Sequence, residues 1–273
     1  MPVLNPRSYL FVPGTRPDRF GKACAAGADA VVLDLEDSVA AADKVKARET
    51  IAEWLSPARP VMVRVNTSDS QWFQDDLGLA SRPGITCVLL PKAERVEEIR
   101  AVAEKFGVGV PILPQIETAR GFRNALALAG ATQVQRLLFG SIDFQLDLGM
   151  TAEEDELLYF RSQLVLDSRL AGILPPVDGV TTDLNSPERV RADTLRARRM
   201  GFGGKMCIHP KQVPVVNESF APSAEEEAWA RRVVEASAEA PGAAISVDGK
   251  MVDRPVLARA EVILAMAAQL RGG

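Results

Sequence analysis

Short and almost continuously apolar segments recur along the chain, and each is followed by a segment with the apolar spacing of a helix. The first four are SYLFVP at 8–13, AVVLDLE at 30–36, VMVRVN at 61–66 and CVLLPK at 87–92. The next four are PILPQIE at 111–117, RLLFGSID at 136–143, GILPPVDGV at 172–180 and GKMCIHP at 204–210. Unbroken apolar runs are typical of parallel strands that are covered on both faces. The pattern therefore predicts eight βα repeats.

The number of repeats indicates a closed barrel. Eight βα units within about 220 residues fit a (β/α)8 TIM barrel, an α/β fold whose usual size is roughly 250 residues. A doubly wound parallel sheet is the alternative, because local patterns do not show ring closure. Polar residues gather at the carboxyl ends of the runs, where barrel enzymes have their active sites, at Glu36, Asp37, Arg64, Asn66, Lys92, Glu117, Asp143, Asp178 and His209. This distribution favours the barrel.

The last fifty or so residues exceed what a barrel needs. The spacing predicts a helix over 221–238, a small hairpin that turns at Asp248-Gly249, and a final helix over 255–270. We therefore expect a catalytic barrel over residues 1–220 and a helix-hairpin-helix extension over 221–273. Such an extension packs on a neighbouring subunit or covers a site.

Composition narrows the class of protein. The chain has 273 residues, 47% of them hydrophobic, and its net charge of -4 comes from 32 basic and 36 acidic residues without a basic block. We therefore expect no nucleic-acid partner. Cys24, Cys87 and Cys207 lie far apart and form no CxxC pair, which predicts reduced thiols. No apolar segment has the length of a signal peptide or of a spanning helix, so we expect a cytoplasmic protein without a membrane partner.

Glu117 and Asp143 end neighbouring predicted strands. In a barrel their carboxylates would lie side by side, and such hard oxygen ligands are those that Mg²⁺ prefers, with its other positions left to water or substrate. The alternative is that each carboxylate only caps a helix, because Thr118 and a short loop after Asp143 come next.

Arg64 lies between valines in VMVRVN, where an unpaired guanidinium would be costly. It must therefore face an anion, which is either Glu36 or Asp37 from the preceding strand or a substrate carboxylate. A purely structural ion pair is the alternative, and both interpretations can hold together.

Basic residues follow the first predicted strand. Arg16, Arg19 and Lys22 in PGTRPDRFGKA could reach a phosphorylated ligand, although exposed basic residues on a helix are usually only solvated.

Two further residues carry competing interpretations. His209 is the only histidine, so Ser-His-Asp hydrolysis is disfavoured and a packed, hydrogen-bonded ring is expected. Asp253 precedes Pro255 at the start of a helix, and on this pattern alone it is an N-cap.

Eight short strings occur in one order over almost the whole chain: SYLFVPGTRPDRFGKA, VVLDLEDSV, VRVN, LPKAE, IETARG, GSID, CIHPKQV and GKMVDRPVL. Together they resemble the citrate lyase β-subunit-like proteins of the HpcH/HpaI aldolase superfamily, in which malyl-CoA and citramalyl-CoA lyases are close relatives. The resemblance implies a Mg²⁺-dependent carbon–carbon lyase that cleaves a 3-hydroxyacyl-CoA thioester into an acyl-CoA and a 2-oxoacid, or runs the condensation in reverse.

The resemblance also implies roles for individual residues. Glu117 and Asp143 would hold Mg²⁺, with Glu117 also at the substrate, and Arg64 would bind the substrate carboxylate. Asp253 would exchange a proton with the acyl thioester from a neighbouring subunit, so a homo-oligomer, trimeric or hexameric, with shared active sites is expected. From the residues themselves, and not from the resemblance, we expect Glu36 or Asp37 to orient Arg64 and count Arg16 and Lys22 among the substrate-binding residues.

One departure and two alternatives remain. Many relatives carry Glu-Asp where this chain has Ile142-Asp143, so a second acid near the metal is missing. One alternative activity is a metal-dependent aldolase acting on free hydroxy-oxoacids, but such enzymes use a histidine near the early strands, where this chain has none. The other is a citryl-thioester lyase subunit that depends on an acyl carrier protein.

Overall fold

The first part of the chain is a closed barrel. The computed structural model describes residues 5–151, 154–239 and 245–271, and the chain divides into two compact units, Met1–Asn217 and Glu218–Gly273. In the first unit, eight parallel strands pair in sequence order, and the eighth pairs with the first. This closure confirms the predicted (β/α)8 barrel and excludes the doubly wound sheet.

Each strand overlaps a run that the apolar pattern predicts. The strands are β1 (Ser8–Pro13), β2 (Ala30–Asp34), β3 (Val61–Arg64), β4 (Ile85–Leu90), β5 (Ile112–Ile116), β6 (Leu138–Phe139), β7 (Val177–Asp178) and β8 (Gly204–Cys207). Strand β4 alone begins before its run, at Ile85 rather than at residue 87. The strands β6 and β7 have only two residues each, far fewer than the runs that contain them, and α7 (Ser141–Leu148) begins directly after the turn at Gly140 that follows β6.

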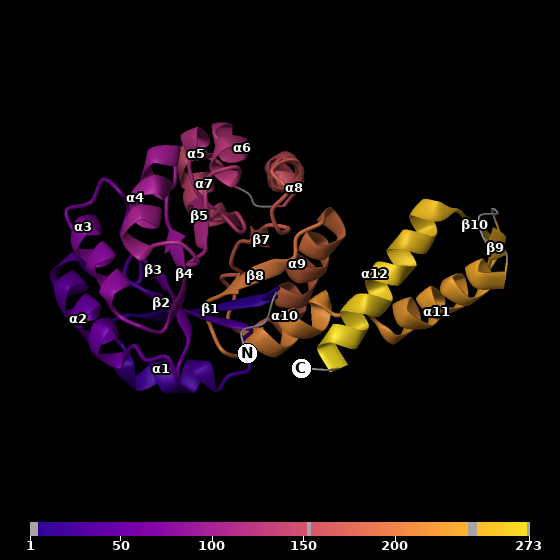
Figure 1. Cartoon of the computed structure of the whole chain (residues 1–273), viewed down its shortest axis with the longest axis horizontal. Helices are drawn as coiled ribbons and strands as arrows, with labels where there is room; N and C mark the ends of the chain where they lie inside the picture. Colours follow the sequence, from indigo (N-terminus) through magenta and orange to yellow (C-terminus); the bar gives the residue numbers. More distant parts are fainter. Residues whose placement is uncertain (1–4, 152–153, 240–244, 272–273) are drawn as a thin grey trace. The chain divides into compact units, whose positions relative to one another are not determined.

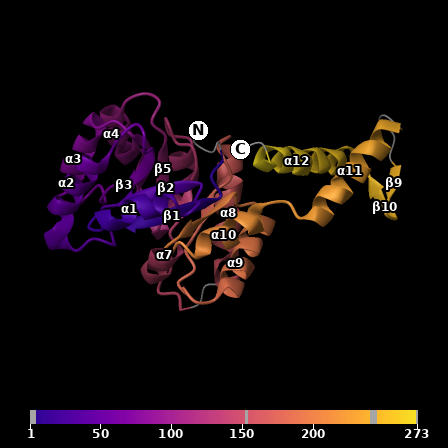
Figure 2. The same ribbon diagram turned by 90° about the horizontal axis from the view of Figure 1, so that it is seen from below.

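Helices surround the strands (Figures 1 and 2). The first group is α1 (Pro17–Cys24), η1 (Ala41–Asp43), α2 (Lys44–Trp54), α3 (Phe73–Asp76), η2 (Leu77–Ser81), α4 (Val96–Phe106), α5 (Ala119–Arg123) and α6 (Ala125–Ala129). The second group is α7 (Ser141–Leu148), η3 (Asp155–Leu157), α8 (Leu158–Leu170), α9 (Pro187–Met200) and α10 (Gln212–Phe220). None of the described helices is long and apolar enough to cross a membrane.

The inside of the barrel is filled with side chains. Because successive strand residues point to opposite faces, alternate residues of each strand meet at the axis. The resulting cluster is Tyr9, Ala30, Val32, Cys87, Leu89, Leu113, Leu138, Val177 and Met206, with Phe11, Met62 and Val180 packed against it. This packed interior leaves the carboxyl ends of the strands as the place for chemistry.

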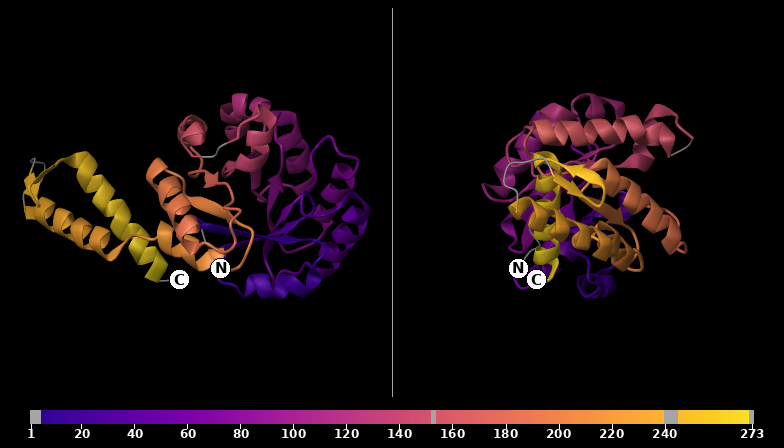
Figure 3. Two further views of the ribbon diagram at one scale, coloured as in Figure 1. Left: turned by 180° about the vertical axis from the view of Figure 1, so that it is seen from behind. Right: turned by 90° about the vertical axis from the view of Figure 1, so that its right-hand side faces the viewer.

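The second unit is a helix-hairpin-helix with its own small core (Figure 3). It comprises α11 (Ala224–Glu239), β9 (Ile245–Val247), β10 (Lys250–Val252) and α12 (Arg254–Arg271). The hairpin turns at Asp248 and Gly249, with φ angles of 51° and 74°, as a two-residue type I′ turn requires. Helix α11 begins at a capping box in which Ser223 and Glu226 bond reciprocally to each other's backbone N–H.

The core of this unit comes from both helices and the hairpin: Ala230, Val233, Val247, Val252, Ala260 and Ile263. These elements form a helix-hairpin-helix, as predicted for the fold, and the first unit ends at Asn217, whereas the sequence pattern placed its end at residue 220. The packing of this extension on a neighbouring subunit stays a prediction.

Candidate active site

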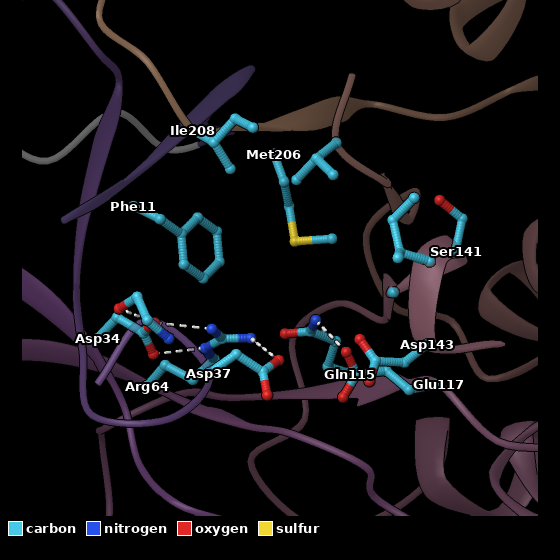
Figure 4. A pocket seen from close by; sticks show the side chains of 14 residues that line it. Phe11, Asp34, Asp37, Arg64, Gln115, Glu117, Ser141, Asp143, Met206 and Ile208 are labelled. Carbon is cyan, nitrogen blue, oxygen red and sulfur yellow. Dashed lines mark hydrogen bonds and ion pairs between the residues drawn. The ribbon is translucent and has the colours of Figure 1, made fainter. Parts of the chain in front are cut away.

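A cavity of about 310 Å³ opens among the carboxyl ends of the strands (Figure 4). Its walls come from the strand ends and from the segments that follow them. The lining residues are Phe11, Asp34, Asp37, Ser38, Arg64, Gln115, Glu117, Gly140, Ser141, Ile142, Asp143, Val180, Met206 and Ile208. This is the face on which barrel enzymes carry their catalytic groups.

Arg64 ends β3 and pairs across the ladder with Asp34, the last residue of β2. Its Nε lies 2.6 Å from Asp34 Oδ1 and its Nη2 lies 2.7 Å from Asp34 Oδ2. Nη1 lies 3.1 Å from Glu36 Oε2, and the guanidinium lies 5.1 Å from the centre of the Phe11 ring. Burial opposes the charge, but Asp34 and Glu36 outweigh that cost and raise the pKa of Arg64 above its ordinary value. The guanidinium is therefore charged and fixed in place.

Asp34 is the main partner of Arg64, and sequence reasoning missed it. Glu36 and Asp37 were the expected partners, and Glu36 does contact Arg64, but Asp37 is 53% exposed and its Oδ2 is 3.7 Å away. Asp34 also accepts the N–H of Glu36 at 2.9 Å and a hydrogen bond from the Ser38 hydroxyl. Burial raises the pKa of Asp34, but Arg64 and Ser38 lower it by more, so its carboxylate stays ionised. A carboxylate inside the apolar run AVVLDLE was the signal that could have identified it.

Glu117 directly follows β5 and is 1% exposed. Its Oε2 accepts the backbone N–H of Lys92 at 2.8 Å, and its Oε1 accepts Gln115 Nε2 at 2.6 Å. The hydroxyl of Thr118, not Glu117, caps α5 by accepting the N–H of Gly121. The capping interpretation of Glu117 is therefore wrong.

The surroundings of Glu117 hold its carboxylate tightly. A Cβ added at Gly140 would lie 2.3 Å from both Cγ and Oε1 of Glu117, so a larger residue there would have to displace the Glu117 side chain. Burial raises the pKa of Glu117 to about 8, although Arg64 and Lys92 oppose the shift. Such a shift marks a carboxylate that lacks enough positive charge around it.

Asp143 lies in the first turn of α7, not at the end of a strand or before a loop. The chain leaves β6 after Phe139 and turns at Gly140, so the residues SID are already helical. No side chain caps α7, so the capping interpretation of Asp143 fails as well. The carboxylate lies beside that of Glu117 (Figure 4). The structure thus brings the two predicted metal ligands together.

The ammonium of Lys92 lies between three of the carboxylates of this site. Its Nζ lies 2.9 Å from Glu36 Oε1, 3.3 Å from Asp143 Oδ1 and 3.8 Å from Asp37 Oδ1. Burial opposes its charge, but Glu117 and Glu36 outweigh it and raise the pKa of the ammonium. On sequence alone Lys92 was one of several polar residues on the rim.

The donor set fits a hard divalent cation. Five carboxylates face two cationic side chains, Arg64 and Lys92; they are those of Asp34, Glu36, Asp37, Glu117 and Asp143. Gln115 Oε1 is buried beside Glu117 and has no hydrogen-bond partner among the described atoms, so it can accept from a metal-bound water. The described residues contain no cluster of three or more His, Cys, Asp or Glu side chains arranged for a metal. Two carboxylates with the other positions left to water or substrate suit Mg²⁺ rather than a transition metal.

Some predicted site residues do not reach the cavity. Arg16 pairs with the exposed Asp18 at 2.9 Å, and Lys22 is exposed on α1. His209 is half-buried, and its Nδ1 accepts the N–H of Lys211 at 3.2 Å, as expected for a packed ring.

Ile142, Asp253 and the three cysteines are further residues that the sequence singles out. Ile142 lines the cavity with an apolar side chain where many relatives carry an acid. Asp253 lies in the second unit, where its Oδ1 accepts the N–H of Val256 at 3.2 Å and caps α12. The N-cap interpretation is therefore confirmed, and a catalytic role for Asp253 stays a prediction. Cys24, Cys87 and Cys207 are all free thiols.

The model of the HpcH/HpaI aldolase/citrate lyase family matches residues 7–210. The chain belongs to this family. A citrate lyase subunit beta-like protein of Deinococcus radiodurans is 39% identical over 280 residues, which cover 96% of this chain and 97% of that protein. A (3S)-malyl-CoA thioesterase of Cereibacter sphaeroides is 35% identical over 278 residues, which cover 96% of this chain and 97% of that protein.

A solved structure shows the same fold in full. CitE from Mycobacterium tuberculosis, in complex with magnesium, acetoacetate and coenzyme A, matches with a TM-score of 0.87 at 36% identity. The match covers 97% of this chain and 99% of that one. The resemblance, the barrel fold and the lyase class that the sequence motifs predict are thereby confirmed.

Proposed function

We propose that this protein is a Mg²⁺-dependent lyase that cleaves a 3-hydroxyacyl-CoA thioester, such as malyl-CoA or citramalyl-CoA, into an acyl-CoA and a 2-oxoacid, or forms it in reverse. One observation carries the proposal. A charged and rigidly held guanidinium, Arg64, faces the carboxylates of Glu117 and Asp143 across one cavity. A 2-oxoacid carries a carboxylate next to an oxygen that can bind a metal, and the site offers a partner for each.

The relatives support this chemistry. Magnesium, acetoacetate and coenzyme A are bound together in the similar CitE structure, which confirms the expected magnesium cofactor at the level of the family. A (3S)-malyl-CoA thioesterase among the relatives supports a hydroxyacyl-CoA as the substrate.

Arg64 is assigned to the substrate carboxylate. Asp34 occupies its Nε and one Nη2 proton, and Glu36 lies beside Nη1, so the guanidinium keeps N–H groups for a ligand. Asp37 is its most loosely held partner, at 3.7 Å and half exposed, and it can give way to an incoming carboxylate. Asp34 keeps the guanidinium in position while this exchange takes place.

Glu117 and Asp143 are assigned to the metal. When bound, magnesium supplies Lewis-acid stabilisation of the negative charge that develops on the substrate oxygen. The backbone N–H of Lys92 and the amide of Gln115 fix the Glu117 carboxylate, so its orientation does not depend on the metal.

Asp253 is assigned to the acyl thioester. As the acid and base that exchanges a proton with the methyl carbon of the acyl group, it would act from a neighbouring subunit in a trimer or hexamer. Lys22 is exposed on α1 and Arg16 is partly exposed in an ion pair with Asp18, and these two cations are assigned to the phosphates of coenzyme A.

Product analysis tests the proposal. Purified protein is incubated with Mg²⁺ and either malyl-CoA or citramalyl-CoA, and the products are separated by chromatography. We expect acetyl-CoA with glyoxylate or pyruvate, and no reaction after chelation of the metal. Free CoA with an intact hydroxy acid would indicate thioester hydrolysis instead, and turnover only after addition of an acyl carrier protein would indicate a dependent lyase subunit. Cleavage of free hydroxy-oxoacids alone would indicate the aldolase alternative.

A further inference from the structure

Lys92 contacts both carboxylates that are assigned to the metal. Its backbone N–H donates to Glu117 Oε2 at 2.8 Å, while its ammonium lies 3.3 Å from Asp143 Oδ1. The ammonium is also 2.9 Å from Glu36 Oε1, and the side chain is 31% exposed. One residue thus connects the two metal ligands with a carboxylate that pairs with Arg64.

The backbone of Lys92 adopts an unusual conformation to make these contacts. Its φ of 45° lies in the left-handed region, which residues with a Cβ rarely adopt. A residue with this strain persists only where its surroundings demand it, and such residues cluster at functional sites. The main-chain bond to Glu117 and the side-chain contact with Asp143 together account for the conformation.

The charge balance indicates what the ammonium does. The carboxylates of Asp34, Glu36, Asp37 and Asp143 outnumber the two cations Arg64 and Lys92 that they contact, and the ammonium of Lys92 lies 3.3 Å from Asp143 Oδ1, an oxygen that a metal would need. Two cations that share one carboxylate oxygen repel each other, and the repulsion is strong where water is partly excluded.

We propose that Lys92 is a positioning residue that serves as a built-in counter-ion: its ammonium balances Asp143 while no cation is bound and competes with the cation for that carboxylate. The inference rests on the proposed metal site. Cation binding displaces the ammonium from Asp143 toward Glu36 and Asp37, which already lie within 3.8 Å of it. Lys92 therefore lowers the affinity of the site for Mg²⁺ and stabilises the metal-free protein.

Two neutral variants test this role. Lys92→Gln removes the charge and leaves the main-chain bond to Glu117 in place. Lys92→Asn also removes the charge, and asparagine tolerates the left-handed conformation. It therefore measures the effect of the charge on Mg²⁺ binding even if the glutamine variant folds poorly. Lys92→Arg keeps the charge, and Lys105→Gln, on the exposed face of α4, makes the same change in net charge away from the site.

The dissociation constant of Mg²⁺ is measured by calorimetry, and Tm is measured with and without Mg²⁺. We expect both neutral variants to bind Mg²⁺ about tenfold more tightly than the wild type, to melt lower without the metal, and to gain more in Tm when it is added. The arginine variant and Lys105→Gln should bind Mg²⁺ as the wild type does.

Contrary results separate the two proposals. Equal or weaker Mg²⁺ binding in both neutral variants would overturn the counter-ion role. A loss of Tm that is the same with and without Mg²⁺ would also overturn it, because that is the effect expected of a merely structural lysine. Absence of Mg²⁺ binding by the wild type would overturn the metal site, and with it the proposed function.

Discussion

Replacement of Asp34 with asparagine tests how the guanidinium of Arg64 is held. The substitution keeps the shape of the side chain but removes the charge that balances a buried cation. Asp34 is 1% exposed and the Arg64 side chain is 8% exposed, so water cannot compensate for the lost charge. Asparagine can still accept one of the two hydrogen bonds that Arg64 now donates to Asp34.

The cost follows from this geometry. Removal of one partner of a buried ion pair costs about 3–5 kcal/mol, because the other charge is left uncompensated. Glu36 remains 3.1 Å from Arg64 Nη1, so the lower end of the range, about 3 kcal/mol, applies. For a unit of this size such a loss lowers Tm by roughly 6–12 °C.

The effect has a defined pH dependence. Burial raises the pKa of Asp34, but Arg64 lowers it by more, so the pKa in the folded protein lies below the unfolded value. The stability that the carboxylate contributes is fully present above the unfolded pKa of about 3.9 and is lost as pH falls through the folded pKa. The difference in stability between wild type and variant should therefore shrink under acid conditions.

Thermal unfolding at neutral pH measures the effect, and KM for the oxoacid in the condensation reaction should rise in parallel. Asp18→Asn is the matched control, because Asp18 also pairs with an arginine through two bonds but is exposed, and we expect no measurable change in its Tm. If Asp34→Asn melts within 2 °C of the wild type with an unchanged KM, the assignment of Asp34 as the residue that fixes Arg64 is refuted.

Three further predictions follow from the site. Glu117→Gln and Asp253→Asn should each abolish turnover, and their co-expression should restore part of it in mixed oligomers; no recovery would argue against an active site shared between subunits. Because the pKa of Glu117 is about 8 and a metal ligand must lose its proton, Mg²⁺ affinity measured by calorimetry should fall about tenfold per pH unit below 8, whereas a flat profile would contradict the shift. Gly140→Ala places a Cβ 2.3 Å from Glu117 and should weaken Mg²⁺ binding at least tenfold, while Gly78→Ala, with open space around it, should not; equal affinities would contradict the close packing.

Sequence patterns were sufficient to predict the barrel, because each buried parallel strand leaves an apolar run and eight such runs fit one architecture. The proximity of Glu117 and Asp143 was predictable because acids at the ends of neighbouring runs must converge at one rim, while their role as metal ligands stays a prediction. The helical position of Asp143 was not predicted, since an apolar run does not show where a two-residue strand ends and the turn at Gly140 begins.

Other parts of the site depend on contacts that local patterns do not contain. The pairing of Asp34 with Arg64 depends on the register between β2 and β3, which brings two residues thirty positions apart face to face. Lys92 acts through a left-handed backbone that lysine seldom adopts, so its place between Glu36 and Asp143 was not foreseeable. Glu36 and Asp37 were expected as partners of Arg64 because they lie at the carboxyl end of the preceding predicted strand, and the pattern does not show that Asp34, two residues earlier, faces Arg64 instead.

The central claim is that Glu117 and Asp143 together hold one Mg²⁺ ion in front of Arg64. Calorimetric titration of Mg²⁺ into the wild type and into the double variant Glu117→Gln/Asp143→Asn, both checked for equal folding by circular dichroism, measures this directly. We predict one Mg²⁺ per chain for the wild type and no detectable binding for the double variant. Binding of the same stoichiometry and affinity by both proteins would contradict the account.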